Sequence, residues 1–245
     1  MALLRPRWLI LNKKSILQKG ILPVLVLLLV LLVVFWAAGQ LKNRGAGKIP
    51  ADEMLSIGLE RTRASASYRY QAETKLIAEG QDNTVFFSQV TGEIVAPADI
   101  HMVGTMMNTP IEFIQAGDNS YFKDQSSGKW IPLPGNKLAD SELFYAELNP
   151  MAYFNFKDVT GLKHTGTEKV NGEELLVLEL RPNLIDPFLE LRLTDYRYKL
   201  WLDPRDYRLR QAALKAKDKQ TPGGEVDINL RLWDYDQVPP INPPS

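Results

Sequence analysis

The chain has 245 residues with 29 basic and 29 acidic side chains, so its formal net charge is zero, and it contains no cysteine. The charges are unevenly distributed, because residues 1–50 hold eight Lys and Arg and no acidic residue, which leaves residues 51–245 with a net charge of −8. An acidic body argues against nucleic acid as a partner. The lack of cysteine excludes a disulfide framework, a thiol nucleophile and a lipid-acceptor cysteine.

An uninterrupted apolar segment near the N-terminus predicts a single transmembrane helix over residues 20–38. The eighteen residues from Ile21 to Ala38 carry no charge. As a helix they would span about 27 Å, close to the hydrocarbon thickness of a bilayer. A cleaved signal peptide is the alternative, because small residues from Ala37 to Gly39 suit a peptidase. The length of the apolar run and the position of Trp36 favour a retained anchor.

The flanking sequence predicts how the chain is oriented and divided. Five basic residues precede the apolar segment and three follow it, so the positive-inside rule places residues 1–19 in the cytoplasm. Residues 39–50 include three glycines and predict a flexible linker. Residues 51–245 are then an extracytoplasmic domain of a single-pass cell-membrane protein.

The domain opens with a predicted helix after Pro50, because proline suits the first helical turn and Leu55 and Leu59 recur at helical spacing. The period then changes to two, which is typical of strands. A helical interlude is expected over residues 138–148, and Asn149-Pro150 predicts a second short helix through Phe156. Strands are predicted at residues 68–78, 84–95, 100–107, 111–116, 120–123, 162–170, 174–181, 196–202, 207–217 and 225–233.

Two local signals give these elements a topology. Asn171-Gly172 predicts a type I′ turn that joins two strands directly, and Gly80 to Asn83 predicts an earlier hairpin turn. A succession of hairpins with few helices indicates an antiparallel sheet with one face covered. We therefore expect an α+β fold, in which a curved antiparallel half-barrel of about ten strands is covered by helices.

Four segments in this order resemble the LolA/LolB and LppX/LprG lipoprotein-carrier superfamily of bacteria: Asn119–Lys123, Gly128–Ile131, Tyr198–Pro204 and Leu232–Ile241. The resemblance implies an unclosed half-barrel with a helical lid and an apolar cavity that holds acyl chains. A transmembrane anchor departs from that pattern, because the periplasmic carriers are soluble and the LppX-type proteins are lipidated. An anchored member suits capture, handover or sensing near the membrane rather than shuttling.

The sequence offers little for catalysis or metal binding. The two histidines, His101 and His164, lie on separate predicted strands and lack partner residues at ligand spacing. Aspartates such as Asp203 and Asp234 lack the glycines and spacing of a calcium loop and are interpreted as turn carboxylates. Phosphate-loop, serine-elbow and HExxH motifs are absent. We expect no catalytic residues, no metal site and no cofactor.

Large apolar residues are the candidates for ligand binding. Predicted strands 84–95 and 100–107 carry apolar side chains on both faces, so each face needs a cover, which a ligand, a partner protein or the bilayer could supply. Ordinary core packing against the helices is the alternative for each residue. The candidates for an acyl cavity are Phe86, Phe87, Met102, Met106, Met107, Phe113, Tyr121, Phe144 and Phe154.

These observations predict a membrane-anchored, extracytoplasmic protein that binds a lipid or the acylated end of a lipoprotein, without catalysis. The alternative is an envelope sensor or scaffold that binds a protein partner, as RseB-like members of the superfamily do.

Overall fold

In the computed structural model, residues 49–78, 84–134 and 148–244 are described, and residues from Pro50 onward form one compact unit. The predicted membrane span, residues 20–38, and most of the interlude at 138–148 lie outside the described residues. Among the described helices, none has the length and apolar character needed to cross a bilayer.

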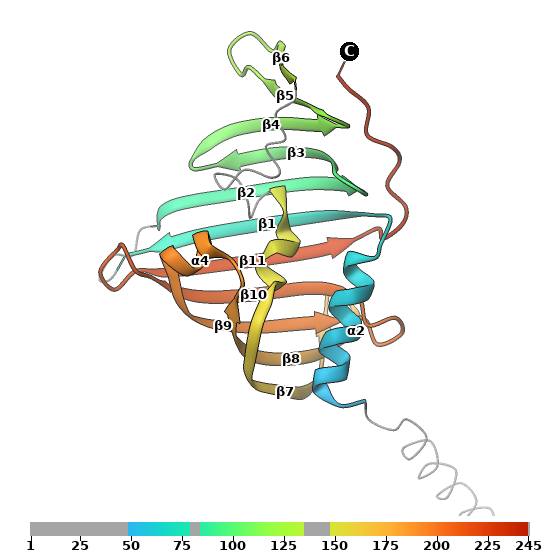
Figure 1. Cartoon of the computed structure of the whole chain (residues 1–245), viewed down its shortest axis with the longest axis vertical. Helices are drawn as coiled ribbons and strands as arrows, with labels where there is room; N and C mark the ends of the chain where they lie inside the picture. Colours follow the sequence, from blue (N-terminus) through green and yellow to red (C-terminus); the bar gives the residue numbers. More distant parts are fainter. Residues whose placement is uncertain (1–48, 79–83, 135–147, 245) are drawn as a thin grey trace, which may run out of the picture. The chain divides into compact units, whose positions relative to one another are not determined.

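The described body is built around one open antiparallel sheet (Figure 1). Its strand order is β6-β5-β4-β3-β2-β1-β11-β10-β9-β8-β7, so β6 and β7 are the two edges. Neighbours in the sheet are also neighbours in sequence, except where β1 pairs with β11. The eleven strands of the described residues are β1 Ser67–Ile77, β2 Thr84–Val95, β3 Asp99–Met106, β4 Thr109–Ala116, β5 Asn119–Lys123, β6 Trp130–Pro134, β7 Phe156–Val170, β8 Glu173–Leu184, β9 Leu193–Leu202, β10 Leu209–Asp218 and β11 Glu225–Trp233.

The predicted antiparallel, unclosed sheet is confirmed, with differences at both edges. Strand β6 was not predicted, and its prolines at 132 and 134 are compatible with an edge, where a missing N–H costs no ladder bond. Strand β7 begins at Phe156 rather than at Leu162. The register shifts between Thr160 and Lys163, and Gly161 has φ +62°, so a bulge hides the alternation of this strand.

The sheet has two faces. Residues that are paired on neighbouring strands lie on the same face, so the strand register shows to which face each residue belongs. We call the face that bears Tyr70 the inner face and the opposite one the outer face. Tyr70 pairs with Leu232 on β11 and with Gly92 on β2. A Cβ at Gly92 would lie 2.4 Å from Cε1 of Tyr70, so only glycine leaves room for this buried ring. The inner face is therefore continuous from β11 through β1 to β2.

Helix α2, Ala51–Arg63, packs on the inner face near β9 and β10 (Figure 1). Its acidic first turn and basic last turn match the helix dipole, as the sequence predicted for the helix start. A Cβ at Gly58 would lie 2.8 Å from the carbonyl oxygen of Tyr207 and 3.3 Å from Leu202, so this glycine permits close approach. The Thr62 hydroxyl donates to the Gly58 carbonyl (2.7 Å) and accepts from the Leu209 amide (2.9 Å).

Two shorter helical elements complete the described body. The helix predicted from Asn149-Pro150 is the 3₁₀ helix η3, Pro150–Phe154, although the Asn149 side chain does not cap it. Helix α4, Pro187–Arg192, was not predicted. The sequence contains the usual residues of a helix start, an aspartate at the N-cap position and a proline in the first turn. In the structure the Asp186 side chain caps the helix by accepting a hydrogen bond from the Leu189 amide. The Asn171-Gly172 turn has φ +51° and +89°, which confirms type I′.

Candidate functional site

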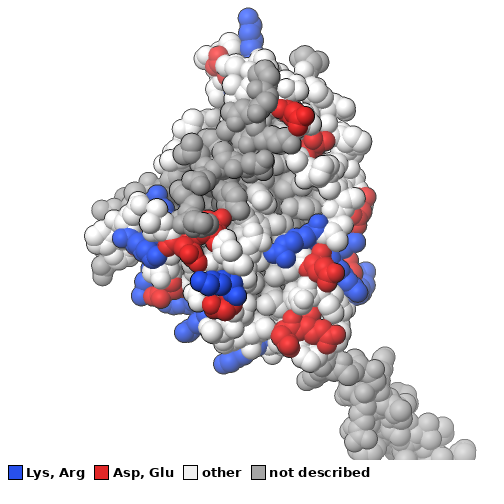
Figure 2. Space-filling model, in the orientation of Figure 1, with Lys and Arg blue, Asp and Glu red and all other residues white. Residues whose placement is uncertain are grey.

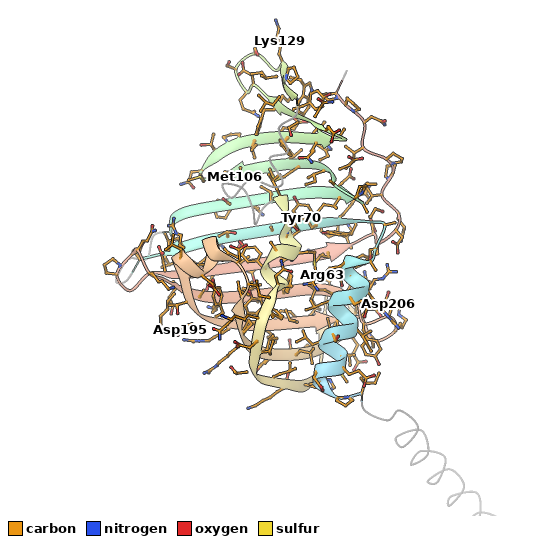
Figure 3. The ribbon with its side chains drawn as sticks, viewed as in Figure 1. Arg63, Tyr70, Met106, Lys129, Asp195 and Asp206 are labelled. Carbon is orange, nitrogen blue, oxygen red and sulfur yellow. The ribbon has the colours of Figure 1, made fainter. Side chains whose placement is uncertain are left out.

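The structure divides the predicted ligand-binding residues between the two faces of the sheet. Met102 pairs with Phe113 across β3 and β4, and both side chains are fully buried on the inner face. Met106 is buried on the same face (Figure 3). The backbone of Phe86 pairs with Leu76 and so belongs to the inner-face row, but its side chain lies outside the described part.

Three of the predicted residues lie elsewhere. Phe87 pairs with Lys75 on the outer face, where the Lys75 ammonium is 5.9 Å from the ring centroid. Tyr121 is also an outer-face residue, since it pairs with Ile114 and Pro132. Met107 follows β3 in a turn with φ +50° and is 60% exposed. These three do not share a surface with Met102 and Phe113. Phe144 lies outside the described residues.

Phe154 is the predicted residue that reaches an open groove. It ends η3, and its ring meets the Tyr198 ring edge-on with centroids 6.1 Å apart. Phe156, the first residue of β7, packs on the same tyrosine at 5.4 Å. The Tyr198 hydroxyl donates to the Tyr153 carbonyl (2.8 Å), which ties η3 to the inner face. Burial raises the pKa of Tyr198 well above its usual value, so this hydroxyl stays a neutral donor.

Arg63 joins η3 to helix α2. It ends the helix, and one guanidinium nitrogen donates to the Phe154 carbonyl (2.8 Å) and to the Asn155 side-chain oxygen (3.2 Å) (Figure 3). A charged donor makes stronger hydrogen bonds than a neutral one. This link holds η3 beside α2 and leaves a groove between the helix, η3 and the start of β7.

The groove has a volume of about 630 Å³, within the range of about 300–1,000 Å³ usual for small-molecule sites. Its polar residues are Asp52, Ser56, Glu60, Arg63 and Asn155. On this side of the body, basic and acidic side chains are interspersed (Figure 2). Apolar side chains form the rest of the groove: Leu55, Leu59, Phe154, Phe156, Val159, Leu162 and Ile185.

Most groove residues were not among the predicted site residues. Leu55 and Leu59 were recognised only as a helical stripe, whose spacing does not say what it faces. Val159 lies before the bulge at Gly161, where no strand was predicted, and Leu162 opens the predicted strand 162–170 but was not singled out as a site residue. Ile185 is 63% exposed, and a single exposed isoleucine in a loop carries no pattern.

Apolar side chains make up most of the lining of the described groove. Among the described residues, no group of three His, Asp or Glu side chains is placed to hold a metal ion. His101 faces Glu112 on the outer face, with 3.7 Å between Nε2 and Oε1. His164 lies on β7, with Nε2 3.0 Å from the Gly166 carbonyl. The two histidines are on separate strands, as the sequence predicted.

Comparison with known proteins identifies the fold. No family model and no curated protein sequence matches the chain. A crystal structure of the Mycobacterium tuberculosis lipoprotein LppX matches with a TM-score of 0.50 and 17% identity, over 77% of this chain and 95% of LppX. The structure of LprF from Mycobacterium bovis matches with a TM-score of 0.54 and 17% identity, over 80% of this chain and 97% of LprF. A LolA superfamily protein of Nitrosomonas europaea matches with a TM-score of 0.35 and 13% identity, over 78% and 96% of the two chains. The body therefore has the fold of LppX and LprF, and the resemblance expected from the sequence is confirmed at the level of the fold.

Proposed function

We propose that this protein is a membrane-anchored, extracytoplasmic binder of acyl chains, carried by a lipid or by an acylated protein, and that it is not an enzyme. The observation that carries the proposal is the groove of about 630 Å³ beside α2, with an apolar lining and a polar rim. The likeness in fold to the lipoproteins LppX and LprF supports it.

Burial of an acyl chain in an apolar groove would favour binding. Each buried methylene contributes about 0.8 kcal/mol, so ten methylenes contribute about 8 kcal/mol before the cost of association. A polar rim with Arg63, Asp52 and Glu60 keeps a headgroup in contact with water and charge. Catalysis has no comparable support in the described residues.

The anchor in this proposal is the apolar segment at residues 20–38, with residues 1–19 in the cytoplasm. Residues 39–50 would then tether the body to the bilayer as a flexible chain of twelve residues with an average end-to-end distance of about 20 Å. A tethered binder acts on lipid or lipoprotein at its own membrane.

The test is native mass spectrometry of the full-length chain extracted in mild detergent. We expect co-purifying acyl species with the wild-type chain. Leu162→Asp and Ile185→Asp each place a carboxylate in the groove, where it opposes hydrocarbon at a cost of several kcal/mol. Both variants should lose the acyl species while their melting temperatures fall by only a few degrees, because neither side chain is fully buried.

The matched control is Leu191→Asp, which introduces the same charge on a leucine that is 71% exposed on α4 and is not among the groove residues. This variant should keep the acyl species. Phe113→Asp is unsuitable as a groove variant, because a carboxylate in place of this fully buried ring should unfold the domain. Wild-type chain that is free of acyl species and bound to a protein partner would instead support the sensor or scaffold alternative.

A further inference from the structure

Strands β8 and β9 separate before their ends and leave a notch in the sheet. Residues 176–180 of β8 pair with residues 198–202 of β9. Beyond this paired part, β8 continues to Leu184 and β9 begins at Leu193. Helix α4 connects the two ends. The notch has a volume of about 320 Å³ and is lined by side chains that include Thr160, Arg181, Asn183, Thr194, Asp195 and Arg197.

A bulge in β9 shapes this notch. On the neighbouring strand, Lys215 pairs with Arg197 but Lys217 pairs with Thr194, so one residue of β10 opposes two residues of β9. One of the two is Asp195, at the start of β9, with φ +56° (Figure 3). The Asp195 carboxylate pairs with Lys217 at 2.9 Å, and this hydrogen bond with the ammonium lowers the pKa of Asp195. Asp195 forms its ion pair with Lys217, while Arg197 and Arg181 act on this carboxylate as weaker causes of its lowered pKa.

The surroundings of the notch are strongly basic. An adjoining hollow of about 570 Å³ shares Arg181 and Arg197 with the notch. Three more basic residues line this hollow, namely Lys163, Lys199 and Lys215, and its one acidic residue among those described is Glu179. Lys199 pairs with Glu168 at 2.7 Å and Lys215 with Asp227 at 3.3 Å. Within the part of the chain that the structure describes, neither arginine nor Lys163 has a carboxylate within 4.0 Å.

This concentration of basic residues contrasts with the body as a whole, which carries a net charge of −8 over residues 51–245. Arg197 and Lys199 belong to the outer face, because Lys199 pairs with Ala213 and Glu179 in the row opposite to Tyr198. The acyl groove is lined by α2, η3 and the start of β7. The notch and its adjoining hollow are therefore separate from the acyl groove, and a ligand of the notch does not require an acyl chain in the groove.

We propose that the notch between β8 and β9 binds a phosphate group, from a phosphate ester or a free phosphate, with Arg181 and Arg197 as its main ligands. A planar guanidinium matches two oxygens of a phosphate, and two such groups beside one hollow favour a dianion over a single carboxylate. Lys163 adds a third positive charge from β7. A soluble phosphate monoester carries two charges, whereas the phosphodiester of a phospholipid headgroup carries one and shares the two free oxygens that a guanidinium can bind.

The experiment is isothermal titration calorimetry of the full-length chain in a non-ionic detergent at low ionic strength. The probes are inorganic phosphate, sn-glycerol 3-phosphate and phosphatidylglycerol, with acetate as a control anion. We expect the phosphate compounds to bind and acetate to bind at least about tenfold more weakly. The glycerol phosphate arm contains no acyl chain, so its result is independent of the acyl groove. Phosphatidylglycerol also has acyl chains, so tighter binding of this lipid than of the two soluble phosphates identifies the headgroup as the source only if the Leu162→Asp groove variant retains it.

Variants test the assignment to the two arginines. The double change Arg181→Gln with Arg197→Gln should weaken phosphate binding by about tenfold or more, and Arg197→Lys should weaken it less, since it keeps the charge and loses the planar fork. Arg205→Gln is the control, because this arginine is 81% exposed in the turn after the other end of β9. Wild-type chain that binds no phosphate compound, or equal losses in the Arg205 variant, would overturn the proposal.

Discussion

At the scale of single residues, buried polar groups fix the turns that shape the body. Asp203 follows β9, is 3% exposed and accepts hydrogen bonds from the Arg205 amide (2.9 Å) and the Arg210 guanidinium (2.9 Å). Burial raises the pKa of this carboxyl, but the hydrogen bonds and the nearby arginines outweigh burial and the net pKa is below the ordinary value. The sequence had predicted a turn carboxylate here, and the structure agrees.

Asp203→Asn should lower the free energy of unfolding by about 1–3 kcal/mol at pH 7, because a buried charge-assisted hydrogen bond with Arg210 is lost. The wild-type carboxyl has a lowered pKa in the folded state, so its contribution is complete above the unfolded value of about 3.9 and is lost as pH falls through the folded value. Urea unfolding of the wild type and the variant at pH 7 and at pH 2.5 measures the loss of stability and its dependence on pH. A difference between variant and wild type that does not shrink at the lower pH would contradict this account.

At the scale of elements, the position of α2 decides where the groove lies. Two contacts fix the helix: Gly58 approaches the Tyr207 carbonyl, and Thr62 bridges the helix and the Leu209 amide. Arg63 then connects the helix to η3. Because the groove is formed between these elements, a loss of helix docking should affect ligand retention as well as stability.

Thr62→Val keeps the shape of the side chain and removes the oxygen that accepts from the Leu209 amide. We expect a loss of about 1–3 kcal/mol, because a buried backbone donor is left without its partner. The melting temperature, followed by circular dichroism, should fall by several degrees. Thr91→Val, at an exposed threonine of β2, is the matched control and should stay within about 0.5 kcal/mol of wild type. Equal effects at the two positions would show that the Thr62 bridge does not stabilise the body.

At the scale of the whole molecule, the sheet stays open and both edges carry features that limit pairing with another chain. Strand β6 contains Pro132 and Pro134, which cannot donate ladder hydrogen bonds. Strand β7 is bent by bulges near Gly161 and Gly166 and carries Lys163 and Lys169. Both edges of the described sheet therefore oppose pairing with a strand of a second chain.

The proposed anchor makes a prediction about topology. A protease added to intact spheroplasts should remove the body and leave a small membrane-protected fragment that contains residues 1–38, because the positive-inside rule places the N-terminus in the cytoplasm. Immunoblotting with tags at the two ends of the chain distinguishes the products, and a cytoplasmic marker protein should survive the treatment. Protection of the body would contradict the orientation and the acyl-binding proposal together.

The sequence by itself determined the features that depend on near neighbours in the chain. Alternation of Val226, Ile228, Leu230 and Leu232 assigned the faces of β11, and Asn171-Gly172 assigned a turn, because side-chain period and backbone φ are local properties. The tertiary structure alone decided how strands that are distant in sequence pair: β1 pairs with β11 although some 150 residues separate them. Period-two alternation specifies a face but no partner strand. For the same reason, the groove between α2 and β7 and the basic notch between β8 and β9 could not be predicted, because their residues meet only after the sheet has formed.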